Sequence, residues 1–418
     1  MFKNSSIQEN ISYVSFFISI YALTALPFSG LILSAIYFIY ITFFIVFLVV
    51  VWDFNSISNL KIGKLSIDKL LLITIFFVML LNVFFFNRQN NSDIKSVSKV
   101  FSYFPVFFIF AIYLPGVFFK NTYKFEAFLN FLIIFGVINT LFGWFALFAG
   151  LQQNVTYPGF LMGLFNHPNA SGFVYSLTIP ILVYKFIYRR YNRIVFSVMI
   201  FVFTLSLLFT FSRAAYIATG VSILILSYYK SKRAFLIMVG IIVILIFTII
   251  VDFTASKGGL SSISRLLLFA TAYDMIIADP FHFMWGYGVV NFYDTFLSEK
   301  LFLGSLEIVA DPHNFILLLG VQFGMIITSL IVFYMIVTLL KSAKSMKRIP
   351  SNSHYRDLFN LCFAVIVSLL IQNMFEDIMI YPEYFLLPLF LVYFGFLMKS
   401  FQHKDFLQIN PGNYLKIN

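Results

Sequence analysis

The chain has 418 residues, of which 61% are hydrophobic, 20% aromatic and only 11% charged. Soluble domains carry about 25% charged residues, so this composition excludes an ordinary soluble protein. The formal net charge of +11 does not indicate nucleic-acid binding, because membrane proteins collect lysine and arginine in their cytoplasmic loops. The one cysteine, Cys362, excludes a disulfide within the chain and is most simply a small buried hydrophobic residue.

Apolar stretches long enough to cross a bilayer recur along the whole chain. A helix needs roughly 20 apolar residues to cross a hydrocarbon core of about 30 Å. The pattern predicts an all-α, polytopic integral membrane protein with a single transmembrane domain over residues 1–418. About twelve membrane-spanning helices are expected, at residues 11–29, 31–52, 68–86, 101–119, 125–149, 170–187, 194–211, 214–229, 234–251, 313–340, 357–374 and 384–400.

Lysine and arginine are unevenly divided between the two sets of predicted loops. With the N-terminus in the cytoplasm, 21 of the 28 basic residues fall on the cytoplasmic side. The positive-inside rule therefore predicts that both termini are cytoplasmic. The remaining seven lie on the outer side: Arg88, Lys95, Lys99, Arg213, Lys257, Arg265 and Lys300.

One long extracytoplasmic loop is predicted over residues 252–312, and it is expected to contain short helices. Gly258-Gly259 near its beginning is typical of a flexible segment. A helix is predicted from Ser264 to Ala278, ended by Asp279-Pro280, and its apolar content suits a helix lying on the membrane interface. Tyr287 follows, in a turn between two glycines.

Two of the outer basic residues, Arg213 and Arg265, lie at the ends of hydrophobic segments. A guanidinium at the bilayer centre costs about 2.5–3.5 kcal/mol on insertion scales, and basic topology anchors prefer the cytoplasmic side. These facts favour a function for Arg213, whereas Arg265 is equally well explained as a solvated surface charge. Arginine presents a planar fork of donors that suits phosphate oxygens. Together the two residues could neutralise a pyrophosphate leaving group without a metal.

His313 stands where the predicted span 313–340 begins, after Asp311-Pro312, which predicts a turn and a helix start. A histidine there can act as a general base near neutral pH, or it can simply cap the helix. His167 and His282 are weaker candidates for the base. The sequence has no metal-ligand spacing, so neither a catalytic metal nor another cofactor is expected.

Two further polar groups lie in the outer loops. Asn166, Pro168 and Asn169 form a turn before the span 170–187, where asparagine either caps the helix or shapes the mouth of a sugar or lipid site. Glu376 and Asp377 could bind sugar hydroxyls, but the simpler interpretation of this acidic pair is loop surface.

Three passages of the chain resemble the O-antigen ligase and polymerase superfamily of bacterial membrane glycosyltransferases. Residues 163–172 are similar to the family's G-x-F-x-x-P-N turn, and Ser212-Arg213 to its S-R pair after a mid-chain span. The third passage resembles the pattern R…P…G-x-G…H-N/S-x-x-L. It comprises Arg265, Pro280, Gly286, Gly288, Phe292, His313, Asn314 and Leu317, followed by Gly320 and Gly324.

The resemblance implies a metal-independent, inverting transfer of a glycan from undecaprenyl pyrophosphate to an acceptor hydroxyl. The site would lie on the extracytoplasmic face of a multi-pass protein of the bacterial inner membrane. His313 would be the base that activates the acceptor, and Arg213 and Arg265 would hold the pyrophosphate. The expected partners are the lipid-linked donor, a glycan or lipid acceptor, membrane lipids and a chain-length regulator. The expected substrate-binding residues are Asn166, His167, Asn169, Asn314 and Tyr287.

Several functions remain open from the sequence. Ligases of the family more often have His-Ser where this chain has His313-Asn314, which favours a polymerase of O-antigen or capsule repeat units over a ligase acting on lipid A–core. A lipid-linked glycan flippase is an alternative of another class. Transporters usually carry charged residues near the membrane midplane, whereas here almost all of them lie outside the predicted spans. A structural or sensor protein without chemistry is the third alternative.

Overall fold

The computed structural model describes residues 106–151, 159–165, 167–188, 192–233, 258–288, 292–299, 312–350, 353–376 and 386–402, with isolated positions at 74, 77, 79, 235, 236, 239 and 240. These residues form helices and connections and contain no strand, which confirms the all-α prediction for the part described. The predicted spans 11–29 and 31–52, and most of 68–86 and 234–251, lie outside the described residues. The count of twelve spans therefore stays a prediction.

The helices of the bundle agree in position with eight of the predicted spans. Four of them, α7, α8, α15 and α16, are long and apolar enough to cross a membrane, as judged by length and composition. The others are shorter or less apolar. In chain order the elements are η2 (Phe108–Tyr113), α6 (Leu114–Lys120), α7 (Thr122–Phe148), α8 (Pro168–Tyr188), α9 (Arg193–Phe209), α10 (Arg213–Lys230), α15 (Phe315–Met346), α16 (His354–Asn373) and α17 (Leu386–Gln402).

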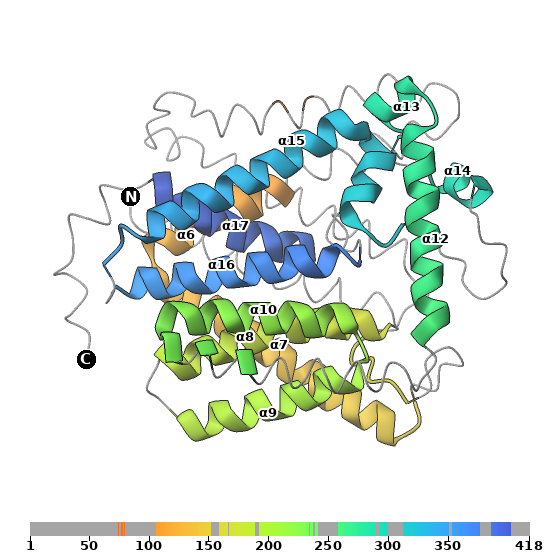
Figure 1. The fold of residues 1–418 in the computed structure, drawn as a ribbon. Coiled ribbons are helices and arrows are strands. Elements are labelled where there is room, and N and C mark those ends of the chain that lie inside the picture. The colour runs from red at the N-terminus through yellow and green to blue at the C-terminus, as the bar shows by residue number, and fades with distance from the viewer. Residues whose placement is uncertain are drawn as a thin grey trace, which may run out of the picture.

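The predicted outer loop contains three helices, α12 (Gly258–Ile277), α13 (Pro280–Trp285) and α14 (Phe292–Glu299). Figure 1 shows α12 lying across one end of the bundle, with α13 and α14 beside it. The predicted helix end at Asp279-Pro280 is confirmed, since Asp279 is the N-cap of α13. The prediction that Gly258-Gly259 forms a flexible segment is wrong, because both glycines lie in the first turn of α12. The first N–H groups of a helix lack intrahelical partners anyway, so a glycine there weakens the helix less than one in its interior.

Small residues allow the central helices α8, α10 and α16 to approach one another closely. A methyl group added at Gly172 of α8 would lie 2.8 Å from Ser212 Cβ and 3.0 Å from Ala215 Cβ of α10. Such small-residue contacts are how membrane helices pack where no hydrophobic force acts between them. The three helices therefore form a tight unit, and their ends are held in a fixed relation to one another.

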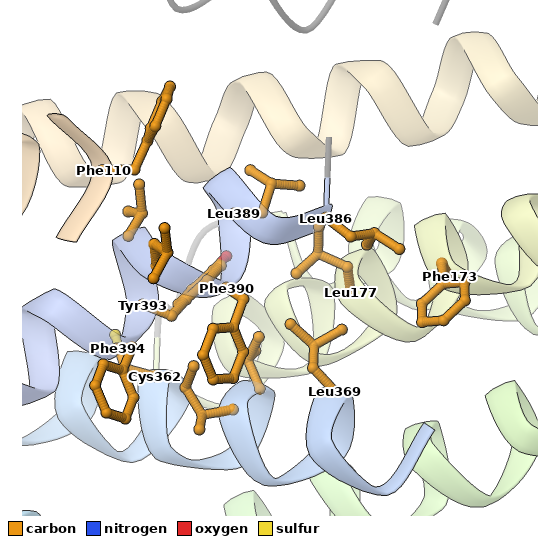
Figure 2. Packing of buried hydrophobic residues seen from close by; sticks show 14 of the residues in the cluster. Phe110, Phe173, Leu177, Cys362, Leu369, Leu386, Leu389, Phe390, Tyr393 and Phe394 are labelled. Atoms are coloured by element: carbon orange, nitrogen blue, oxygen red, sulfur yellow. The ribbon is translucent and has the colours of Figure 1, made fainter. Parts of the chain in front are cut away.

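A second, mainly apolar layer packs α17 against α16 and η2. Figure 2 shows Phe390 and Phe394 of α17 beside Cys362 and Leu369 of α16, with Phe110 of η2 nearby. Cys362 is fully buried among these side chains, which confirms its interpretation as a small hydrophobic residue.

Helix α15 is broken at Gly324, whose backbone is left-handed at φ 77°. The predicted span 313–340 did not anticipate this break. The loop between α13 and α14 fills it: Tyr287 N–H donates to Val321 O at 2.8 Å, and Gly288 N–H donates to Gln322 O at 3.0 Å. The loop thus satisfies carbonyl groups that the interrupted helix leaves without an intrahelical partner. Short α13 and the N-terminal part of α15 are consequently held as one piece.

We expect Gly324→Ala to lower the free energy of unfolding by about 3 kcal/mol or more. Its Cβ would lie 2.2 Å from Met284 O and 2.4 Å from Trp285 N, on a backbone that only glycine adopts freely. The measurement is thermal unfolding of the purified protein in detergent. Gly116→Ala is the matched control, because the nearest atom to its Cβ would be Lys399 Cε at 4.0 Å. Equal stability of the two variants would contradict the role given to Gly324.

Candidate active site

The polar ends of several helices meet where α12 crosses the bundle. Asn169 in the first turn of α8 and Arg265 of α12 both donate to Glu376, which follows α16 directly. Asn314, immediately before α15, donates from Nδ2 to Met374 O at the end of α16, 2.8 Å away. Segments separated by more than 200 residues in sequence are thus brought together at one point.

Glu376 lies at the centre of this group and is only 3% exposed. Its Oε1 accepts hydrogen bonds from Arg265 Nη2 at 3.0 Å and from Asn169 Nδ2 at 2.6 Å. Arg265 Nη1 also donates to Phe375 O at 3.1 Å. The interpretation of Glu376 as loop surface is therefore wrong. Burial of a carboxylate is costly unless it is paired and hydrogen-bonded, and here both conditions are met.

His313 faces the same carboxylate. Its Nδ1 is buried and lies 3.9 Å from Glu376 Oε2, whereas the side chain as a whole is 26% exposed. The ring nitrogen Nδ1 therefore lies on the inner side, toward Glu376. The backbone of His313 has a left-handed φ of 47°, which costs a non-glycine residue of order 1–3 kcal/mol and is found preferentially at functional sites.

Arg213 and Arg265 influence each other electrostatically. Arg213 is the first residue of α10, just before the predicted span 214–229, and its side chain is exposed. Partial desolvation by the surrounding protein, followed by the positive charge of Arg265, lowers the pKa of Arg213 below its ordinary value. A guanidinium whose charge is disfavoured by burial and by a neighbouring guanidinium is stabilised by an anion bound beside it.

His167 stands at the edge of the group. Although its side chain is exposed, desolvation by nearby protein and the charges of His313 and Arg265 lower its pKa to about 4. Its Nδ1 accepts a hydrogen bond from Asn169 N–H at 3.2 Å, which requires an unprotonated Nδ1. His167 is therefore neutral near pH 7, so it cannot add a third positive charge to the site.

The glycine-containing turn before α8 is held by residues that the sequence analysis did not single out. Asn139 of α7 is fully buried, and its Oδ1 accepts from Leu164 N–H at 2.9 Å. At Gly163, which has a φ of 62°, a Cβ would lie 2.1 Å from Asn139 Oδ1 and 2.4 Å from Ser171 Oγ. The turn therefore needs glycine at this position, and it presents Asn169 to Glu376. Asn166 lies outside the described residues.

Both polar atoms of the Asn314 side chain make hydrogen bonds within the protein. Its Oδ1 accepts from Ile316 N–H and Leu317 N–H, which makes it the N-cap of α15, while its Nδ2 donates to Met374 O. These bonds fix the residue next to His313 between two helix ends. A direct contact of Asn314 with substrate stays a prediction.

Tyr287 lies against α12 and α13. Its hydroxyl donates to Met275 O at 3.1 Å, and its ring stacks on His282 with the centroids 3.9 Å apart. This position joins α12, α13 and the break in α15. The expected substrate-binding role of Tyr287 stays a prediction.

The arrangement is chemically suited to a phosphorylated substrate. Helices α8, α10 and α15 all begin at this end of the bundle, and a helix N-terminus carries about half a positive charge and free N–H donors. Two arginines add to this field, and one carboxylate partly offsets it. Among the described residues, no three His, Cys, Asp or Glu side chains gather as a metal site requires.

Residues 195–332 match a family model described as O-Antigen ligase. The match includes Arg213, Arg265 and His313, but neither residues 163–172 nor Glu376. No curated protein matches the chain. This match, over about a third of the chain, supports the resemblance to the O-antigen ligase and polymerase superfamily.

Proposed function

We propose that this chain is a glycosyltransferase that polymerises lipid-linked repeat units of a surface polysaccharide. The observation that carries the proposal is the buried Glu376, which pairs with Arg265 and faces His313, with Arg213 near enough to Arg265 to be affected by its charge. Two guanidinium groups and three helix N-termini suit the pyrophosphate of an undecaprenyl-linked donor. A histidine beside them suits the removal of a proton from an acceptor hydroxyl.

The proposed step is a single displacement at the anomeric carbon. The acceptor oxygen attacks that carbon from the side opposite the pyrophosphate, so the configuration inverts. The new C–O bond forms as the bond to the pyrophosphate oxygen breaks, and the acceptor proton passes to His313. The lipid pyrophosphate leaves with its negative charge stabilised by Arg213 and Arg265, so the step does not require a metal.

The proposed orientation in the bacterial inner membrane places this site on the extracytoplasmic face. Support comes from the opposite end of the bundle, where Glu126 of α7 pairs with Lys185 of α8 and lies 3.7 Å from His354 of α16. The helices α8, α10, α15 and α17 all carry a lysine in their last turn. That end has the basic character expected of a cytoplasmic side.

A ligase that transfers the finished glycan to lipid A–core would use the same chemistry. Asn314 is the sequence feature that favours the polymerase. Serine is also a strong N-cap residue, so either residue can start α15, but asparagine can in addition donate its amide to Met374 O. The distinction is therefore best made by experiment.

The test is the glycan phenotype of a deletion strain, with the wild-type gene on a plasmid as control. Loss of a polymerase leaves core carrying a single repeat unit, whereas loss of a ligase leaves bare core. The purified polymerase should also convert lipid-linked repeat units into longer lipid-linked chains without lipid A. Bare core in the deletion strain would replace the polymerase by the ligase. Failure of the purified protein to consume the donor would favour the flippase.

A further inference from the structure

The carboxylate of Glu376 is held by side chains of two other helices, and both of these hydrogen bonds reach the same oxygen. Oε1 accepts from Arg265 of α12 and from Asn169 of α8, while the chain position directly after α16 sets the backbone. Oε2 is the atom nearest to His313 Nδ1, at 3.9 Å. Arg265 and Asn169 thus hold the carboxylate through Oε1, whereas Oε2 is the oxygen that faces His313.

The exposure of His313 shows which ring nitrogen is available to a substrate. Nδ1 is buried, so the 26% of the side chain that is exposed comes from its other atoms, and Nε2 is the ring nitrogen left for a substrate. A carboxylate beside Nδ1 favours the tautomer that carries its proton there and leaves a lone pair on Nε2. A base that accepts the acceptor's proton needs that lone pair. Hydrogen bonds of catalytic groups are often long without substrate and shorten in the complex.

The charges around His313 make a negative partner necessary during the reaction. Arg265 of α12 and, beyond it, Arg213 of α10 bring two positive charges to this end of the bundle, and His167 before α8 is neutral near pH 7. When Nε2 takes up the acceptor's proton, a third positive charge forms among them. Among the described residues named here, Glu376 is the one whose negative charge faces the imidazole of His313.

We propose that Glu376 is the positioning residue of His313: it orients the imidazole and stabilises the imidazolium that forms when the acceptor is deprotonated. The inference rests on the proposed function, because it assumes that His313 is the base. Glu376 does not itself take the proton. Its carboxylate stays charged throughout the step, as an orienting acid does in a Ser-His-Asp triad.

The test is the kinetics of Glu376→Gln, which keeps the size of the side chain and a hydrogen-bonding oxygen but removes the charge. We expect kcat to fall by about 10²–10⁴-fold, with a smaller change in the KM of the lipid-linked donor. The acidic limb of the pH–rate profile should move to lower pH, because the carboxylate that favours the protonated imidazole is gone. In a His313→Ala background, the same substitution should have little further effect.

Glu126→Gln is the matched control. Glu126 is another partly buried glutamate that pairs with a basic residue, Lys185, but at the opposite end of the bundle. A purely structural role for Glu376 predicts that the two variants lose folded protein alike and keep the wild-type pH profile, which would overturn the inference. Should Glu376→Gln fail to fold, Glu376→Asp keeps the charge but moves it away from His313, and kcat should then fall without loss of folded protein. Wild-type kcat in that variant would also overturn it.

The outcomes separate this inference from the proposed function. If His313→Ala retains full activity, the proposed function fails and Glu376 has no base to position. If His313→Ala is inactive while Glu376→Gln keeps wild-type kcat and pH profile, only the role of Glu376 is overturned.

Discussion

We expect replacement of His313 to lower the rate of the proposed glycan transfer by about 10²–10⁴-fold, the range for loss of a general base. The acceptor hydroxyl must lose its proton as it attacks, and no other imidazole has its inner nitrogen 3.9 Å from a buried carboxylate among the residues that the structure describes. The measurement is the formation of longer lipid-linked glycans by the purified protein. Donor binding should remain, because the pyrophosphate is held by Arg213 and Arg265.

The choice of substitution matters at this position, because the backbone of His313 is left-handed. Alanine adopts that conformation at a cost, whereas asparagine is among the residues that tolerate it best. Both His313→Ala and His313→Asn should lack activity, and His313→Asn should unfold at a higher temperature. An active His313→Asn would show that backbone conformation rather than the imidazole matters.

His282→Ala is the matched control for the loss of an imidazole. His282 is 33% exposed, similar to the 26% of His313, and its Nδ1 lies 2.5 Å from Asp279 Oδ2. Asp279, however, is itself 43% exposed and caps α13, so this pair lies on the surface. We expect His282→Ala to keep wild-type activity. Loss of activity in both variants would leave the base unassigned.

The positions of the helices could be predicted because hydropathy is a local property of the sequence. The described part of the bundle places α7, α8, α9 and α10 within a few residues of the predicted spans. The break in α15 could not be predicted in this way. Gly324 in an apolar helix is usually tolerated, and the loop that fills the break, at Gly286–Gly288, comes from a different part of the chain.

The partners of the predicted site residues could not be found from the sequence either. Arg265 and Glu376 are 111 positions apart, and nothing local to either residue indicates that they meet. A pattern in α16 does point to Glu376: Ser368 and Gln372 precede it at intervals of four, and both are fully buried. A polar face that continues past the end of a buried helix indicates that the next residue on that face is buried too.

The second large effect expected is that of Arg265→Ala on both activity and stability. Removal of one group that stabilises the leaving charge lowers the rate by about 10²–10³-fold. The same substitution leaves the carboxylate of Glu376, 3% exposed, without the guanidinium that pairs with it. The buried carboxylate keeps the hydrogen bond from Asn169 but loses its ionic partner, which costs about 1–3 kcal/mol. The measurements are transfer activity and thermal unfolding of the same purified sample.

A double substitution separates the two effects. In Arg265→Gln with Glu376→Gln, both charges of the pair are removed, and removal of both partners restores stability that removal of one has cost. Transfer activity should stay low, because Arg213 alone remains for the pyrophosphate and no carboxylate faces His313. Recovery of activity together with stability would mean that Arg265 acts only by neutralising Glu376.

Arg193 is the matched control for Arg213, because both are exposed residues at the start of a helix. Arg213→Ala should lower transfer about as much as Arg265→Ala, yet leave the unfolding temperature unchanged, since its side chain is exposed. Arg193→Ala removes the same group at the opposite end of the bundle, where α9 begins, and should change neither. If Arg213→Ala behaves like Arg193→Ala, a single guanidinium, that of Arg265, carries the leaving charge. If all three retain activity, the charge at this end of the bundle serves the fold and not the transfer.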